Sequence, residues 1–187
     1  NFNNISILCI GCGPGSFTGI RTVISAAKGI QTSNINIKSI GINSLAGLAM
    51  SVLNEAKGKN IKYVLSSIDS KRGDVFIQLY KINNLDIASL PFSAINEIKA
   101  IKIENLNKYI SINKLNETDI LFVGHQSKSL KNKIKNLKIS DKLDQNPNAL
   151  WVAKLTFYLV NKKMDTKSSN LIFNNFKPIY VRYPQIN

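Results

Sequence analysis

The chain has 187 residues, which is long enough to bury a core as one domain or as two small lobes. Hydrophobic residues make up 44% of it, and no run of about eighteen or more apolar residues occurs, so the sequence given contains no candidate membrane-spanning helix. The net charge of +14 comes almost entirely from lysines spread along the chain amid abundant asparagine and isoleucine, and this composition alone does not indicate nucleic-acid binding.

The first part of the chain predicts a strand, a glycine turn and a helix. Residues 5–10 are a continuous apolar run rich in β-branched residues, which is typical of a strand covered on both faces. After the turn, apolar residues at a helical period predict a helix over residues 18–31. Ser16 or Thr18 is expected to cap this helix, because a hydroxyl there can accept from a free N–H group of the first turn.

The turn itself has the sequence GCGPGSFTG, and it admits two interpretations. Its glycines permit positive φ angles and close approach of another backbone, and free N–H groups at a helix start suit a phosphate. However, the Gly-Lys-Ser/Thr ending of a phosphate-binding loop is absent, and Ser16 replaces the third glycine of a dinucleotide fingerprint. Phosphate contact therefore stands beside a purely structural turn or protein-contact loop. The residues in question are Gly11, Gly13, Gly15 and Ser16.

The next elements continue the alternation. Residues 36–42 predict a second strand, and Ser44 is expected to cap a second helix that runs through about Ala56. An order of strand, helix, strand and helix is typical of a parallel sheet. The pattern changes at the polar stretch KGKN, where we place the boundary between two lobes, residues 1–60 and 61–187, with packing of the last segment back on the first lobe as an alternative.

Beyond that boundary, the stretches KYVLSSI and VFIQLYKI predict two strands joined by the turn DSKRGD, residues 69–74. This spacing favours a hairpin with Gly73 in the turn. Residues 85–118 look irregular, with at most a short helix, and residues 120–124 predict another strand. Pro147 is expected to open a helix through about Lys163, in the first-turn position that proline favours. The stretch FKPIYVRYP then predicts a short extended segment.

The densest group of lysines recurs at helical spacing after the strand at 120–124. The predicted helix carries Leu130, Ile134 and Leu137 on its other side, as an amphipathic helix does. Its lysine face is interpreted as a solvated surface, with a patch that attracts RNA as the alternative. The lysines at this spacing are Lys128, Lys131, Lys135 and Lys138.

The sequence shows no evident catalytic or metal-binding set. His125 is the only histidine, and Cys9 and Cys12 form a single C-x-x-C pair, which is too few ligands for a zinc site. Both cysteines are expected to be buried free thiols, in keeping with a reducing cytoplasm. Asp69 and Asp74 flank the hairpin turn, where we expect local turn caps, with metal binding as the alternative.

Only three arginines occur, at positions 21, 72 and 182, in a chain that otherwise uses lysine. This pattern indicates a need for a planar, always-charged group at these sites. Arg21 at a helix start opposes the helix dipole, so we expect a carboxylate, carbonyl or phosphate partner for it.

All three arginines fall in stretches that resemble the bacterial TsaB (YeaZ) family of tRNA threonylcarbamoyladenosine biosynthesis proteins, within the Gcp-like superfamily. GPGSFTGIRTVISAAKGI resembles its G-P-G-S-F-T-G-[LVI]-R signature and the small-residue helix after it. IDSKRGDVFIQLY resembles D-A-R-[RM]-G-E-V-Y, and FKPIYVR resembles the closing P-x-Y-[LV]-R. NIKSIGINSLAGLA and FVGHQS match more weakly, and the matches run in order over nearly the whole chain. The motif residues outside the first stretch are Asp69, Arg72, Gly73, Asp74, Tyr180 and Arg182.

The resemblance implies an α/β, two-lobed fold of the actin/Hsp70/sugar-kinase (ribonuclease H-like) type. It implies a non-catalytic dimerisation subunit, not an enzyme by itself, which pairs with and activates a TsaD-type catalytic subunit. When alone, a homodimer and a monomer are the two alternatives. A TsaE-type ATPase joins the pair, and tRNA is reached through the complex, which modifies the adenosine beside the anticodon in tRNAs that read ANN codons. ATP and metal are expected on the partner subunits, with no cofactor on this chain.

Two alternatives of the same fold remain, an independent nucleotide-binding protein and an inactive peptidase-like relative. In the TsaB family, the helix after the glycine turn joins a helical bundle with the partner. Ser25, Ala26, Ala27 and Gly29 are small enough for close helix packing, so a leucine at position 26 or 27 is expected to weaken the heterodimer. The interface residues implied are Thr18, Arg21, Thr22, Ser25, Ala26 and Gly29.

The sequence departs from the family pattern in two ways. Family members open with a strand carrying Asp-Thr-[SA], a hairpin and a long helix, roughly fifty residues that the sequence given lacks, and it also lacks an initial methionine. The strand at 5–10 is therefore expected to expose a sheet edge, and we expect either that this chain folds poorly alone or that the sequence is truncated. Ser70 and Phe76 stand where the family usually has alanine and tyrosine.

Overall fold

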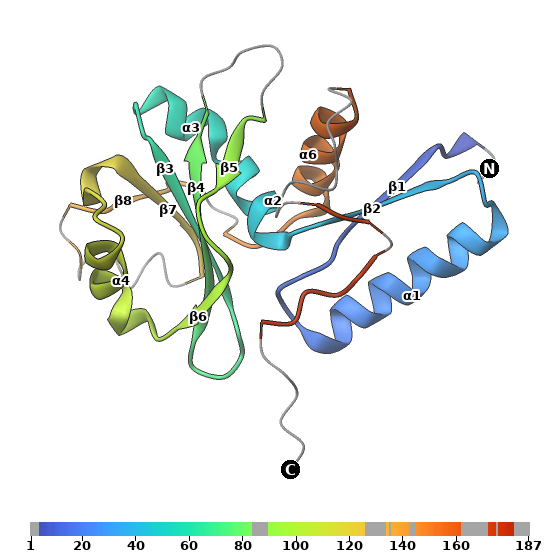
Figure 1. Ribbon diagram of the computed structural model, residues 1–187, viewed down its shortest axis with the longest axis horizontal. Helices are drawn as coiled ribbons and strands as arrows, with labels where there is room; N and C mark the ends of the chain where they lie inside the picture. The colour runs from blue at the N-terminus through green and yellow to red at the C-terminus, as the bar shows by residue number, and fades with distance from the viewer. Residues whose placement is uncertain are drawn as a thin grey trace.

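The computed structural model describes residues 4–83, 90–125, 134, 136–142, 145–161, 172–174 and 176–181. Within these ranges, two β-sheets lie on either side of a short central helix, α2 (Ser44–Ser51) (Figure 1). No helix of the described part combines the length and the apolar character that a membrane crossing requires.

The first sheet contains β1 (Ile7–Gly11), β2 (Lys38–Ile42) and β9 (Ile172–Asn174), in that order. β1 and β2 are parallel, as predicted, and their ends lie within two residues of the predicted ones. β9 comes back from the far end of the chain and pairs antiparallel with β2. Among the described strands, β1 has a neighbour on one side only.

α1 (Phe17–Ser33) connects β1 to β2 and confirms the predicted helix. Of the two expected caps, Ser16 is the observed one: its Oγ accepts a hydrogen bond from the Gly19 N–H at 3.3 Å, whereas Thr18 lies inside the helix. The helix packs with one face on the first sheet, as its apolar period requires. Its buried residues are Ile20, Ile24 and Ala27.

The expected second helix is two helices, α2 and α3 (Leu53–Gly58), because Val52 leaves the helical conformation with φ −113° and ψ 9°. The prediction that Ser44 caps α2 was wrong. Asn43 is the N-cap, since its Oδ1 accepts from the Leu45 N–H at 2.9 Å, and Ser44 is the first helical residue. α2 is almost wholly buried, which explains why it shows no polar face in the sequence.

The second sheet is built on the predicted hairpin of β3 (Tyr63–Asp69) and β4 (Val75–Ile82), with Gly73 in the turn at φ +80°. β7 (Ile120–Gly124) is the predicted strand and lies parallel to β3. The strand order is β5 (Phe92–Ala94), β4, β3, β7 and β8 (Lys138–Ile139), and β6 (Lys99–Ile101) also pairs with β4.

Residues 85–118 hold more regular structure than expected. β5 (Phe92–Ala94) and β6 (Lys99–Ile101) both pair with β4, and α4 (Leu106–Ile112) packs beneath the sheet. Two short 3₁₀ turns, residues 103–105 and 117–119, flank α4. β5 and β6 were not predicted, because three residues are too few to show the alternating pattern of a strand.

Two predictions near the end of the chain need correction. Lys138 begins β8 (Lys138–Ile139), so the lysine-faced helix does not extend to it, and Lys128, Lys131 and Lys135 lie outside the described residues. Pro147 precedes α6 (Ala149–Asn161) and is not in its first turn, because the Asn148 Oδ1 accepts from the Leu150 N–H at 2.8 Å and so occupies the cap. Lys163 also lies outside the described residues.

The main apolar core runs from β2 through α2 to the second sheet and is closed by α6. Ile42, Leu45, Val64 and Leu155 represent these four layers, and each is almost fully buried. A second core lies between the other face of the second sheet and α4. Because β9 and α6 return to the first sheet, the end of the chain belongs with its beginning, and the lobe boundary at residue 60 stays a prediction.

Candidate functional site

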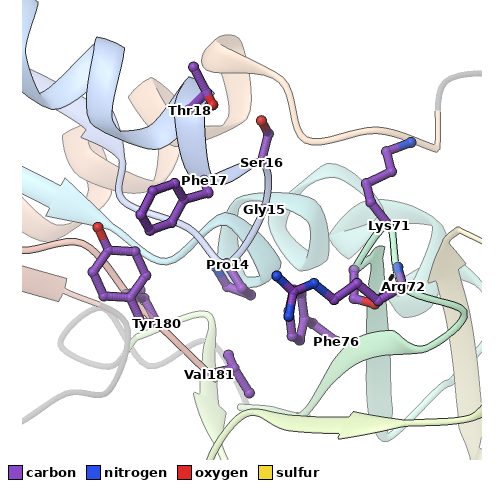
Figure 2. Close-up of a pocket in the computed structure, with 12 residues that line it drawn as sticks. Pro14, Gly15, Ser16, Phe17, Thr18, Lys71, Arg72, Phe76, Tyr180 and Val181 are labelled. Atoms are coloured by element: carbon purple, nitrogen blue, oxygen red, sulfur yellow. Dashed lines mark hydrogen bonds between the residues drawn. The ribbon is translucent and has the colours of Figure 1, made fainter. Parts of the chain in front are cut away.

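Three segments that are far apart in the sequence meet around one cavity of about 470 Å³. The glycine turn supplies residues 14–18, the β3–β4 turn supplies residues 70–72 together with Phe76, and the C-terminal segment supplies residues 179–181 (Figure 2). These are parts of the three stretches on which the family resemblance was based. We call this cavity the convergence pocket.

The glycine turn is held in place by its own backbone. The Cys12 N–H donates to the Ile42 carbonyl at 2.8 Å, the Cys12 carbonyl accepts from Ile179 N–H at 2.8 Å, and the Gly13 carbonyl accepts from Ser44 N–H at 2.7 Å. Gly13 has φ +101°, and a Cβ there would lie 2.7 Å from the Ile20 side chain, so only glycine fits without strain.

The turn therefore divides into two parts. Gly11 and Gly13 serve a structural purpose, because their backbone joins β2, α2 and the C-terminal segment. Gly15 and Ser16 line the convergence pocket, with Ser16 also capping α1. The sequence alternative of a structural turn is thus supported at the start of the motif, whereas phosphate contact at its end stays a prediction.

Arg21 finds a partner of a kind that the sequence did not indicate. Its Nε donates to the Tyr180 hydroxyl at 3.0 Å, and its guanidinium lies 3.8 Å from the centre of the Phe17 ring. The Phe17 and Tyr180 rings are themselves 5.5 Å apart. Within the described residues, a phenol hydroxyl and an aromatic ring thus take the place of the expected carboxylate or carbonyl, and the phosphate alternative stays a prediction.

The β3–β4 turn is fixed by Asp69, as the turn-cap prediction required. Its Oδ1 accepts from the Lys71 N–H at 2.8 Å, and its Oδ2 lies 3.1 Å from the Lys71 Nζ. Burial disfavours the charged carboxylate of Asp69. The two hydrogen bonds from Lys71 and the electrostatic attraction of the nearby His125 ring outweigh this effect and lower the pKa of Asp69. Asp74 contributes its backbone carbonyl, which accepts from the Ser70 N–H at 3.1 Å.

Arg72 is the cation of the turn that faces the convergence pocket. Figure 2 shows its side chain extending from the turn towards Pro14, beside the Phe76 ring. Its backbone N–H donates to the Ser70 Oγ at 3.2 Å, but within the described part of the chain its guanidinium has no hydrogen bond or ion pair. Arg182, the third arginine, lies outside the described residues.

The expected interface residues of α1 form one exposed stripe along the helix, opposite its buried face. A shallow groove on this stripe begins at Phe17 and runs to Ala26. Ala27 was wrongly included among the small residues of this surface, because it is 3% exposed and packs on the first sheet. The exposed stripe consists of Thr18, Arg21, Thr22, Ser25, Ala26 and Gly29.

Comparison with known protein families then identifies the family to which this chain belongs. The family model described as "TsaD: tRNA N6-adenosine threonylcarbamoyltransferase" matches residues 1–182. The chain belongs to the TsaD family. Within this Gcp-like group it is TsaB/YeaZ-like, as the sequence resemblance indicated.

The individual relatives agree with that placement. "tRNA threonylcarbamoyladenosine biosynthesis protein TsaB" from Bacillus subtilis (strain 168) is 26% identical over 125 residues, which are 66% of this chain and 48% of the relative. The chain therefore spans about half the length of this curated relative. YeaZ from Pseudomonas aeruginosa superposes with a TM-score of 0.67 at 15% identity, covering 96% of this chain and 76% of that one. A structure titled as an uncharacterised protein with similarity to peptidase YEAZ, also from Pseudomonas aeruginosa, gives a TM-score of 0.66 at 15% identity, covering 97% and 76%.

The fold of this TsaD-family chain is the α/β, Gcp/actin-like fold that the resemblance implied. Both cysteines are free thiols: Cys12 is fully buried, as expected, but Cys9 is only half-buried. Burial raises the pKa of Cys12 to about 11, which leaves its thiol protonated and unreactive at neutral pH. In the described ranges, no three histidine, cysteine, aspartate or glutamate side chains come together as a metal site would require.

Some residues that line the pocket of this TsaD-family chain were not predicted as site residues from the sequence. Phe17 lies one helical turn before Arg21, a spacing that indicates an aromatic–cation pair on a helix and would have identified it. Phe76 and Val181 carried no comparable signal, since an apolar residue in a strand or an extended segment predicts burial in the core.

Proposed function

We propose that this chain is a non-catalytic subunit in tRNA threonylcarbamoyladenosine biosynthesis, and that it pairs with and activates a TsaD-type catalytic subunit. The name of the Bacillus subtilis relative supports the pathway, and the family match supports a partner of the TsaD type. In this proposal, a TsaE-type ATPase joins the pair and tRNA is reached through the complex. ATP and metal reside on the partner subunits.

The observation that carries the proposal is the exposed stripe of α1. Besides Arg21, it combines two threonines, a serine, an alanine and a glycine, which would allow the backbone of another helix to approach closely. The first acidic residue of the chain is Glu55, so this surface carries only positive or no formal charge. A helix left with small side chains on an exposed face is suited to helix–helix association. The same stripe serves a homodimer when the catalytic partner is absent.

The proposed reaction assigns the substrate chemistry to the partner. The assembly transfers a threonylcarbamoyl group to the adenosine beside the anticodon in tRNAs that read ANN codons. This chain contributes the surface that holds the catalytic subunit in its active arrangement.

The deciding experiment is co-elution of this protein with the TsaD-type subunit of the same organism on a sizing column at moderate salt. A stable complex is the expected result. It would be followed by reconstitution of tRNA modification, in which omission of this protein should abolish the threonylcarbamoyladenosine product detected by mass spectrometry. Separate elution, even with the TsaE-type ATPase and ATP present, would contradict the proposal.

A further inference from the structure

We propose that the convergence pocket binds an acidic and apolar segment of the catalytic partner, and that the Arg72 guanidinium holds a carboxylate of that segment. This inference rests on the proposed function, because it names what the surface beside α1 recognises. It adds a second contact region to the helix stripe and predicts its chemistry.

The walls of the pocket are apolar enough to receive a protein side chain. Phe17 is 42% exposed and Tyr180 is 41% exposed, although large aromatic side chains are usually buried. Phe76 is half-buried at the opposite wall, with Ile179 and Val181 completing the lining. Exposed aromatic groups gathered around one concave site are typical of the anchoring pockets of protein interfaces.

The charge of the pocket favours an anion. Arg72 has no hydrogen bond or ion pair from its guanidinium in the described part of the chain, and its planar group can give a carboxylate two parallel hydrogen bonds. The first turn of α1, residues 16–18, also opens into the pocket and contains no acidic residue to balance its positive end. Asp69 lies nearby, but its carboxylate is already paired with Lys71.

The position of the pocket favours a protein segment as its occupant. Phe17 and Thr18 line both the pocket and the groove on the α1 stripe, so the two surfaces are continuous. A partner helix packed on the stripe would therefore bring its adjoining chain to the mouth of the pocket. A nucleotide is the less favoured occupant, because the turn lacks the Gly-Lys-Ser/Thr ending that holds nucleotide phosphates.

Arg72→Glu in the full chain tests the charge. Titration calorimetry with the TsaD-type subunit should show affinity that is weaker by roughly tenfold or more, because an incoming carboxylate would meet a like charge. Arg72→Gln should fall between this variant and the wild type. Lys81→Glu is the matched control: it makes the same charge change at the far end of β4, where the side chain is exposed, and should bind within roughly twofold of the wild type.

A cross-linking experiment tests the contact itself. In the double variant Lys71→Arg/Arg72→Lys, the turn keeps its charge and carries its only amine at position 72. A carbodiimide, which joins amines to carboxylates that are in contact, should link position 72 to an aspartate or glutamate of the partner. Mass spectrometry of the linked peptide would also identify that residue.

The outcomes separate the two proposals. If the wild type and Lys81→Glu form no complex, the proposed function fails and this inference fails with it. If the complex forms but Arg72→Glu binds like the wild type, or position 72 gives no link to the partner, the pocket inference alone is wrong. If ADP or ATP binds the isolated protein only when Arg72 is present and blocks the cross-link, the pocket is a nucleotide site and the inference is likewise overturned.

Discussion

At the scale of single residues, Gly124 at the end of β7 leaves no room for a side chain. It has φ +113°, and a Cβ there would lie 1.9 Å from the Ser67 carbonyl oxygen and 2.8 Å from the Leu48 side chain. We expect Gly124→Ala to lower the free energy of unfolding by about 3 kcal/mol or more, because β3 and β7 would have to separate locally. Urea unfolding measures this change.

Gly73→Ala provides the control for that measurement. Gly73 also has a positive φ, +80°, but nothing lies within 4 Å of a Cβ built there. Its substitution should therefore cost only the left-handed backbone strain, about 1 kcal/mol. Equal effects of the two substitutions would show that the close approach of β3 to Gly124 is not what requires glycine.

Cys12 gives a pH dependence whose sign can be worked out. Its pKa is raised by burial from the ordinary value of 9.0 to about 11, so the folded state holds the thiol proton more tightly than the unfolded state does. The resulting stability is complete below pH 9 and is lost as the pH rises towards 11. Between pH 8 and pH 10 the wild type should lose about 1 kcal/mol more unfolding free energy than Cys12→Ala, measured by urea titration. Parallel losses would show that burial does not raise the pKa of the Cys12 thiol in the folded protein.

From the sequence, the positions that need a particular side chain could be predicted better than the groups that those side chains contact. The scarcity of arginine in a lysine-rich chain indicated that Arg21 and Arg72 are sites that need a guanidinium. Arg72 lines the convergence pocket, and Arg21 lines the adjoining groove on α1. The partner of Arg21 could not be inferred, because Tyr180 lies 159 positions away and is brought close only by the return of the C-terminal segment.

At the scale of elements, the exposed stripe of α1 can be tested apart from the stability of the helix. Ala26→Leu adds bulk where a partner helix is proposed to pack, and it should weaken the complex by roughly tenfold or more, which corresponds to the usual cost of overpacking of about 1–3 kcal/mol. The free energy of unfolding of the Ala26→Leu protein should change little, because the side chain at position 26 is exposed. Calorimetric titration with the catalytic subunit gives the affinity.

Two further leucine variants separate the explanations. Ala153→Leu makes the same substitution on the exposed side of α6 and should leave the affinity unchanged. Ala27→Leu forces bulk into the contact between α1 and the first sheet and should lower the melting temperature of the protein itself. The stripe would lose its proposed role if Ala26→Leu and Ala153→Leu bound the partner equally well.

Elements could be predicted where their sequence pattern is long. α1 spans four turns and the β3–β4 hairpin has two strands with a glycine turn, so both carry a clear period. β5, β6 and β9 have three residues each, and they exist only because β4 and β2 offer edges to pair with. The break between α2 and α3 at Val52 likewise follows from packing in the core, which no local pattern reveals.

At the scale of the whole molecule, a buried polar network joins the two sheets. Asn43, which follows β2, donates from Nδ2 to the Gln78 Oε1 on β4 at 2.6 Å, and the Tyr80 hydroxyl donates to the same oxygen at 2.7 Å. Gln78 in turn donates from Nε2 to the Asn96 carbonyl at 2.9 Å. Asn43, Gln78 and Tyr80 are all at most 1% exposed, so water cannot replace these bonds.

Because Gln78 is at the centre of this network, its substitution should destabilise both sheets. Gln78→Leu keeps the volume of the side chain but leaves the buried Asn43 amide, the buried Tyr80 hydroxyl and the partly buried Asn96 carbonyl without their partner. We expect it to lower the free energy of unfolding by about 3 kcal/mol or more. Tyr80→Phe removes only one donor, while Asn43 still satisfies the Gln78 oxygen, and it should cost about 1 kcal/mol.

Two probes decide whether the network couples the sheets. The single tryptophan, Trp151, reports from α6 beside the first sheet, and far-UV circular dichroism reports on the whole chain. Both should shift to the same lower urea midpoint in Gln78→Leu, because α2 still joins both sheets through one apolar core. A tryptophan transition that stays at the wild-type midpoint while the circular dichroism shifts would mean that the sheets unfold separately, and that α6 unfolds with the first sheet although it lies beyond residue 60.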